Sequence, residues 1–282
     1  MPTPKKTTKK KSTAVATTGG GGALITHDYG DYAGRGFAGM SAADQAIPFV
    51  YPLQPQSPQI IKPSKKIEGA HAGMFINNVT GALLDGEKGF CFLPCATRNA
   101  YVEWVPRDSG GGKVAEYAIR DEVVLRAKRE AKKFNELRVG TNDLIETFYC
   151  VGIVLAEDME TPVGYAILSF SSTGIKPYKT GIGELQTFAR GTPLFAHRVH
   201  ISSKQEENDQ GTWFNWVIRP AIREEGNDWR QNTALSVLDP ANEQHRALLQ
   251  LGALLEETFV AGTANIASEE RASGAGTDEE KF

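Results

Sequence analysis

The sequence predicts a mainly β fold, a small antiparallel barrel with one inserted helix and a second helix near the C-terminus. Short runs of alternating apolar and polar residues recur from Met74 to Pro220, and turns rich in Gly, Pro and Asn separate them. Strand and helix patterns do not alternate regularly, which argues against a doubly wound parallel sheet. With 282 residues, 40% hydrophobic and 23% charged, the chain has enough material for a sizeable core.

Composition divides the chain into four segments. Residues 1–45 are rich in Gly, Ala, Thr and Lys and lack hydrophobic periodicity, so we expect a disordered basic arm. Residues 46–222 are expected to form the folded core, with a proline-rich extended lead-in over 46–66. A helical extension is expected over 223–266, and an acidic tail over 267–282.

The strands of the core are expected in order along the chain. "GFCFLPC" and "AYVEWV" form a pair joined by "ATRN", and the loop "PRDSGGGK" leads to the strand "VAEYAI". Two long central strands follow, "LIETFYCVGIVLA" and "GYAILSFSS". The last pair consists of "LFAHRVHIS" and "TWFNWVIRP", separated by the polar connection "SKQEENDQG".

Helical spacing predicts three helices. The first covers 120–137 and stops at Gly140, and a short one covers 182–189. The third begins with Asp239 as its N-cap and Pro240 in its first position. Its apolar stripe either packs on its own barrel, the interpretation we prefer, or on a second subunit; the stripe consists of Leu248, Leu251, Leu255 and Phe259.

Cysteine usage and hydropathy indicate a cytoplasmic protein. The three cysteines are odd in number, which argues against a disulfide framework and for a reducing compartment. No apolar run is long enough to cross a membrane, and the N-terminal lysines are not followed by the apolar stretch of a secretory signal. Cys91 with Cys95, and His197 with His200, have side chains that can bind zinc, but core packing explains these residues better.

The motifs of catalysis are missing or incomplete, so we expect no enzyme, no cofactor and no bound metal. "SGGGKV" lacks the spacing of a phosphate loop and has Val114 in place of the magnesium-binding hydroxyl residue. The sequence has no G-x-S-x-G nucleophile motif. "REAK" offers the Glu-x-Lys of some nucleases, but it lies on a charged helix face where solvated ion pairs explain it.

Basic residues interleaved with aromatic ones predict contact with single-stranded nucleic acid. Cations follow the phosphates and exposed rings stack on bases. The mixture recurs in "YVEWVPR", "STGIKPYKTG", "FAHRVH" and "TWFNWVIR". In an alternating strand half of the rings must face the core, so Trp104 is open to either role. Tyr178 is expected to be exposed, because it lies in a stretch that Gly and Pro break up.

The two ends of the chain carry opposite charges, which suggests a polyanionic partner. Residues 1–22 contain five lysines and no acid, whereas 267–282 contain five acids against two bases. An acidic tail can compete with DNA for a basic groove of the same protein. The final Phe282 and its carboxylate offer a handle for a partner's pocket.

This tail, "GTDEEKF", resembles that of the single-stranded DNA-binding proteins of bacteria and T7-type phages. It departs from the bacterial pattern, because no proline precedes the last residue and Lys281 interrupts the acids. The stretch from Ile67 to Pro220 also resembles a broad group of phage-encoded proteins, through "YVEWVPRDSGGGKV", "LIETFYCVGIVL" and "SFSSTGIKPYK".

The resemblance implies an oligonucleotide-binding (OB-fold) barrel that protects single strands, often as a homodimer. It implies phosphate contacts by Arg107, Lys113, Lys176, Lys179 and Arg198. It implies base stacking by Tyr101, Trp104, Tyr178 and Trp216. It implies a tail that binds replication proteins such as a polymerase, primase or helicase through Asp278, Glu279, Glu280 and Phe282.

The sequence therefore predicts a non-enzymatic phage protein that coats single-stranded DNA during replication or recombination. One alternative is a structural component of the virion or its scaffold, since such a role also tolerates charged, flexible ends. A second alternative is a metal-dependent nuclease.

Overall fold

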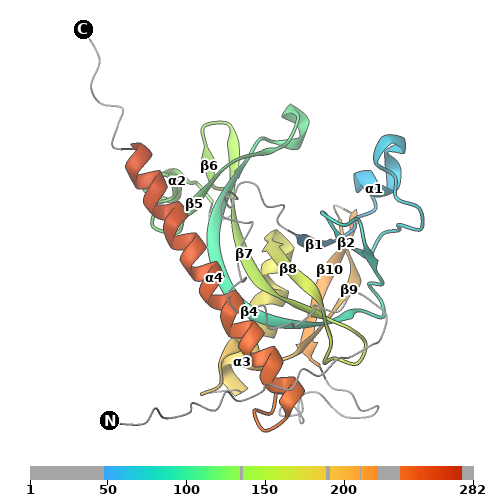
Figure 1. Ribbon diagram of the computed structural model, residues 1–282. Coiled ribbons are helices and arrows are strands. Elements are labelled where there is room, and N and C mark those ends of the chain that lie inside the picture. The colour runs from blue at the N-terminus through green and yellow to red at the C-terminus, as the bar shows by residue number, and fades with distance from the viewer. Residues whose placement is uncertain (1–47, 134–135, 189–190, 210, 222–235, 275–282) are drawn as a thin grey trace, which may run out of the picture.

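The computed structural model describes residues 48–133, 136–188, 191–209, 211–221 and 236–274 (Figure 1). Its ten strands are β1 (Phe49–Pro52), β2 (Phe75–Asn77), β3 (Leu83–Leu84), β4 (Phe90–Trp104), β5 (Lys113–Ala118), β6 (Arg138–Val139), β7 (Asn142–Leu155), β8 (Pro162–Ser171), β9 (Val199–Asn208) and β10 (Gly211–Pro220). Its α-helices are α1 (Pro58–Ile61), α2 (Glu122–Glu130), α3 (Ile175–Phe188) and α4 (Glu243–Gly274). Short 3₁₀ turns are η3 (Pro63–Lys65), η4 (Arg107–Ser109), η5 (Ser172–Gly174) and η6 (Leu194–Ala196).

The strands form one curled sheet, so the expected mainly β fold is confirmed. The sheet follows the order β10-β9-β4-β7-β8-β1-β2-β3, while β5 pairs with β4 and β6 with β7. Its pairs are antiparallel except for β1, which runs parallel to β8. Figure 1 shows the sheet bent into an open half-barrel, with α4 lying across its outside.

Strand β4 is longer than the sequence predicted. "ATRN" does not turn the chain, and β4 pairs with β7 along almost its whole length. A register shift between Pro94 and Ala96 marks a bulge, which lets a proline stand inside a central strand. The two expected strands are therefore one bent strand, whereas the expected loop to β5 is confirmed by η4 and three glycines with positive φ.

Strand β9 also differs from the sequence prediction. It starts at Val199, after the turn η6, and it continues to Asn208 through most of the segment expected to be a polar connection. Its antiparallel pairing with β10 is unbroken from Val199 to Asn208. Beyond Ile201, β9 pairs with β10 but no longer with β4. Its polar side chains there remain solvated, so their polarity did not signal a loop.

The inside of the curl holds the largest core cluster. It joins side chains from seven strands and α3, including Phe75, Phe92, Phe170 and Trp216. Helix α3 packs on β10, β7 and β8 and thereby closes this inner face. The helix starts at Ile175, well before the short helix expected over 182–189, and Pro177 fits its first turn, where the missing N–H costs no hydrogen bond.

Helix α2 lies on the same inner face, nearer the β4–β5 hairpin. Val124 and Ala127 pack on Tyr101 of β4 and Leu144 of β7. Asp121 caps the helix by accepting a hydrogen bond from the backbone of Val123 at 2.8 Å. The expected stop at Gly140 is wrong. The helix ends at Glu130, and Gly140, with φ of 60°, shapes the turn between β6 and β7.

Helix α4 packs on the opposite, outer face of the sheet. Leu248 is buried in a cluster with residues of β4 and β7, and Leu251 and Leu255 pack against it, so the preferred interpretation is confirmed for these three leucines of the stripe. The predicted cap is wrong. Asn242 accepts hydrogen bonds from the backbone of Gln244 and His245, and Asp239 instead accepts one from Ala241 in the preceding turn.

Candidate nucleic-acid interface

Two lysines on the inner face each lie over an aromatic ring. The Nζ of Lys179 on α3 is 5.0 Å from the ring centroid of Phe148. The Nζ of Lys128 on α2 is 4.5 Å from the ring centroid of Tyr101. Both lysines are exposed, so each ammonium group is held at a protein surface beside a π face.

A polar pair connects the two lysine–aromatic contacts. In the β4–β7 register, Asn99 lies opposite Phe148, and Tyr101 lies opposite Glu146. Since side chains two apart on a strand share a face, these four residues form one patch. The Nδ2 of Asn99 donates to Oε1 of Glu146 at 3.1 Å across it.

We call this patch, with the two lysines, the inner-face site; it consists of Asn99, Tyr101, Lys128, Glu146, Phe148 and Lys179. Helices α2 and α3 flank the site at its two ends along the strands. Helix α2 packs next to Leu144 and α3 next to Phe148, on the same face of β7. Positive charge at the rim and aromatic and hydrogen-bonding groups at the floor are the elements that single-strand binding requires.

Three residues expected to bind nucleic acid lie elsewhere, at the β4–β5 hairpin. Trp104 is 38% exposed and stands opposite Lys113 in the β4–β5 register. It shares the outer face of β4 with Val102. Lys113 donates a hydrogen bond to Glu116 at 2.7 Å, so a carboxylate already balances its charge. Arg107 begins η4 in the connecting loop, but its side chain lies outside the described part of the structure.

Tyr178 is not exposed, contrary to the expectation from its sequence neighbours. It lies in α3 with 8% of its surface accessible, and its ring packs between Phe148 at 4.9 Å and Phe170 at 5.1 Å. Burial raises the pKa of its hydroxyl to about 12. The neighbouring Lys176 and Lys179 do remain exposed, since the helix turns them away from the core.

Two further aromatic candidates are buried, which corrects their expected role as open stacking surfaces. Trp216 is 4% exposed and packs on Phe75 and Phe170 inside the main core. Tyr101 is 5% exposed and lies beneath α2. A base can therefore reach Tyr101 only at the edge left by Lys128, and it cannot reach Trp216 in this conformation.

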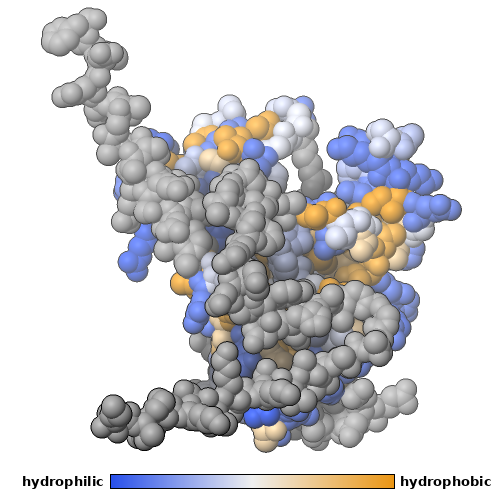
Figure 2. Space-filling view, viewed as in Figure 1, coloured by the Kyte–Doolittle hydropathy of each residue, from blue (hydrophilic) through white to orange (hydrophobic). Residues whose placement is uncertain are grey.

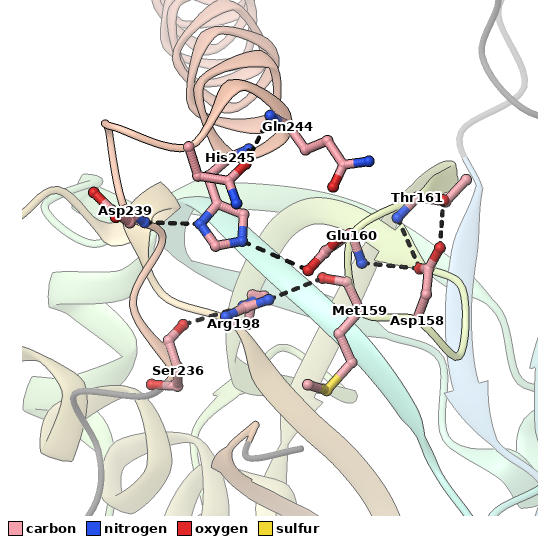
Figure 3. A network of polar contacts seen from close by, with 10 residues as sticks. Asp158, Met159, Glu160, Thr161, Arg198, Ser236, Asp239, Gln244 and His245 are labelled. Carbon is pink, nitrogen blue, oxygen red and sulfur yellow. Dashed lines mark hydrogen bonds and ion pairs between the residues drawn. The ribbon is translucent and has the colours of Figure 1, made fainter. Parts of the chain in front are cut away.

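Arg198 is buried and serves as an internal anchor, which corrects its expected contact with phosphate. It donates from Nε to the carbonyl of Ser236 at 3.4 Å and from Nη1 to the carbonyl of Met159 at 3.3 Å (Figure 3). Figure 3 shows that it joins the β7–β8 turn to the segment before α4. The same region places His245 of α4 3.9 Å from Glu160. These contacts hold the first turn of α4 against the sheet.

Sequence reasoning missed Phe148, Lys128, Asn99 and Glu146. The alternation of "LIETFYC" does place Glu146 and Phe148 on one face, but which face meets α2 and α3 depends on the fold. It also missed a basic segment around η3, where Lys62, Lys65 and Lys66 are all exposed. Figure 2 shows hydrophilic residues clustered over this projecting part of the molecule.

The three cysteines and His197 pack as core residues, whereas His200 is half-buried. Cys91, Cys95 and Cys150 are buried and unbridged, and His197 is 3% exposed, with burial lowering its pKa. Among the described residues, no group of three or more His, Cys, Asp or Glu side chains is placed to hold a metal ion. Within the same residues, no helix is long and apolar enough to span a bilayer.

The basic arm over 1–45 and the tail residues Asp278, Glu279, Glu280 and Phe282 lie outside the described residues.

Comparison with known proteins gives one family: residues 17–231 match the family described as "Pam3 phage gp34-like protein". Neither a curated protein nor a solved structure matches the chain.

Proposed function

Since the chain belongs to the Pam3 phage gp34-like protein family, we propose that it serves a phage as a single-stranded DNA-binding protein. In this proposal it coats exposed strands during replication or recombination and carries out no catalysis. The DNA backbone follows the inner face between α2 and α3, where Lys128, Lys176 and Lys179 contact phosphates. Bases turn toward Phe148.

The observation that supports this proposal best is the pair of lysine–aromatic contacts on one face of β4 and β7. An exposed lysine over a ring is already desolvated on one side. Its ammonium group can leave the ring and bind a phosphate, and a base can then stack on the ring in place of the ammonium group. Stacking of a base on an aromatic side chain contributes about 1–3 kcal/mol and is tolerant of sequence. The arrangement therefore suits a protein that binds many sequences.

The ends of the chain have supporting roles in this proposal. The lysines of residues 1–22 add non-specific attraction for the backbone. The acids of residues 267–282 compete with DNA for the basic surface and recruit replication proteins such as a polymerase, primase or helicase. Dimer formation is compatible with the proposal, but the leucine stripe of α4 is already used within the chain.

Fluorescence anisotropy of a labelled mixed-sequence single strand tests the proposal. The full chain is titrated across a salt series, and the same is done with the duplex of that sequence. We expect strong preference for the single strand and a slope of log affinity against log salt of about −0.7 per phosphate neutralised. Absence of binding at low salt rules the proposal out.

A double variant locates the interface. Lys128→Ala with Lys179→Ala should weaken binding and make the salt slope shallower by about 1.4, the value for two phosphate contacts. The matched control is Lys88→Ala with Lys204→Ala, which removes two exposed lysines that form ion pairs elsewhere with Glu157 and Glu206. Equal effects of the two double variants would show that binding does not depend on the inner-face site.

The same preparation separates the alternatives. Assembly of the protein into regular particles without DNA, seen by electron microscopy, would favour a structural role in the virion or scaffold. Release of product from labelled DNA after long incubation with Mg²⁺ would favour a nuclease. Neither outcome is expected.

A further inference from the structure

Asn99 carries an acceptor that no described residue satisfies. Its Nδ2 donates to Glu146, but its Oδ1 is shielded from solvent and has no hydrogen-bond partner among the described residues. Reversing the amide does not help, because the oxygen would then face the carboxylate of Glu146 and the NH₂ group would lose its acceptor. The orientation with a lone acceptor is therefore the favourable one.

A buried polar atom without a partner is costly and uncommon. Most buried side-chain polar atoms in proteins are hydrogen-bonded, and leaving one unpaired destabilises the folded state. This atom lies within the inner-face site, between the two lysine–aromatic contacts. A donor supplied by a ligand would satisfy it.

The groups around the atom define the donor. Phe148 stands directly opposite Asn99 and offers an aromatic surface. The carboxylate of Glu146 beside it is a second acceptor. A flat ring that carries an N–H₂ group at its edge matches a floor of one aromatic ring and two acceptors. The exocyclic amino groups of cytosine, adenine and guanine have this form, and thymine has none.

We propose that the inner-face site selects a nucleobase with an exocyclic amino group, which donates to Oδ1 of Asn99 while the base stacks on Phe148. This inference rests on the proposed function and adds to it a preference among bases. Entry of the base displaces Lys179 from the ring, and this exposed, flexible side chain then reaches a phosphate of the same strand.

The test compares oligo-dC with oligo-dT, which have the same ring size. Cytosine carries the amino group at C4, whereas thymine carries a carbonyl there together with an N3–H and a 5-methyl group, so a third strand is needed to isolate the amino group. Labelled strands of about 15 nucleotides, near the upper site size of one single-strand-binding barrel, are titrated at slightly alkaline pH. We expect oligo-dC to bind about five- to tenfold more tightly, the effect of one hydrogen bond. A strand of 2-pyrimidinone, which is cytosine without its amino group, should bind like oligo-dT.

Asn99→Ala should bring the ratio of the two affinities to about one and leave oligo-dT binding nearly unchanged. The control is Asn208→Ala, an exposed asparagine near the β9–β10 turn, which should keep the ratio. Should Asn99→Ala fail to fold, the wild-type comparison with 2-pyrimidinone still decides whether the amino group of the base determines the preference.

Each outcome has its own meaning. Equal affinity for oligo-dC and oligo-dT in the wild type overturns this inference and leaves single-strand binding intact. A preference for oligo-dC that persists in Asn99→Ala overturns the assignment to Asn99. Failure to bind any strand removes the proposed function together with the inference.

Discussion

The side chain of Gln54 pairs with the backbone of Phe214 as a neighbouring strand would. Its Oε1 accepts from the Phe214 N–H at 2.9 Å, and its Nε2 donates to the Phe214 carbonyl at 2.8 Å, across 160 positions of sequence. Gln54 follows β1, and Phe214 lies in β10 at the far end of the strand order. One amide thus bridges two parts of the curled sheet that the described strands do not pair.

Removing this bridge should weaken the fold. Gln54→Ala loses both hydrogen bonds and leaves two groups of the Phe214 backbone unpaired, so we expect the free energy of unfolding to fall by about 1–3 kcal/mol. Urea denaturation measures the change. Gln56→Ala removes an exposed glutamine two residues away and should stay within about 0.5 kcal/mol of wild type. Equal values for the two variants would contradict the bridge.

Gly86 should not tolerate a side chain. A Cβ placed there would stand 1.7 Å from the carbonyl oxygen of Gly73, a backbone atom that also accepts a hydrogen bond from Ser203 at 2.6 Å. Gly86→Ala must therefore move the backbone, and we expect destabilisation above about 3 kcal/mol or loss of soluble folded protein. Thermal unfolding monitored by circular dichroism reports it.

The control for the buried Gly86 is the half-buried Gly164. Gly164 lies inside β8, and a Cβ there would meet nothing within 4 Å. Gly164→Ala should leave the midpoint of thermal unfolding unchanged or slightly raised, because alanine reduces the freedom of the unfolded chain. A loss as large as that of Gly86→Ala would show that the close approach is not the cause.

Stability should depend on pH through Glu116. Burial by itself raises the pKa of Glu116, but the hydrogen bond from Lys113, the charge of Arg98 and the Tyr149 hydroxyl outweigh it and hold the pKa below its ordinary value of 4.5. A carboxyl with a lowered folded-state pKa stabilises the protein above its unfolded pKa, and this contribution disappears as the pH falls through the folded value.

Glu116→Gln should therefore be less stable than wild type at neutral pH and should lose less stability on acidification below 4.5. Urea denaturation at neutral pH and at successively lower pH values gives the two curves. Glu207→Gln, at an exposed position of β9, should run parallel to wild type. Parallel curves for Glu116→Gln as well would contradict the role of this ion pair.

The thiols should be unreactive in the native protein. Burial raises the pKa of Cys91 and of Cys95 to about 12, and it raises that of Cys150 further. Because the thiolate is the reactive form, a disulfide reagent at mildly alkaline pH should modify none of the three cysteines until denaturant is added. Rapid reaction of one thiol in the native state would show that its site opens to solvent.

The acidic tail should compete with DNA. A variant that ends at Gly276 should bind a single strand more tightly at low salt, and the gain should vanish at high salt, where charges are screened. Replacing Asp278, Glu279 and Glu280 by their amides in the full chain should reproduce the effect while keeping Phe282. Anisotropy titrations with and without added salt measure the change in affinity. An affinity that both variants leave unchanged would limit the tail to recruiting partners.

The sequence predicted the class of fold and most of the strands because alternation of apolar and polar residues is a local property. The β4–β5 loop, the helix α2 and the leucine stripe of α4 followed from local patterns in the same way. The first helical residues of α4 did not, because both Asp239 and Asn242 are good caps. Packing of the preceding turn decides between them.

The exposure of the aromatic residues could not be predicted. "GIKPYKTG" contains residues that often break helices, but α3 forms there because Tyr178 gains a buried place between Phe148 and Phe170. Burial of one ring outweighs a modest loss of helix propensity. Arg198 was expected at the surface, and its two carbonyl acceptors come from segments about 40 residues away on either side of it.

By itself, the sequence determined a mainly β chain of a phage family with oppositely charged ends, since composition and periodicity are written along the chain. Only the tertiary structure decided which cations and rings meet. Lys128 and Lys179 lie over their rings, on one face, because α2 and α3 pack on the same side of β4 and β7. Contacts between residues distant in sequence depend on how the strands pair and how the sheet curls, and no local pattern specifies either.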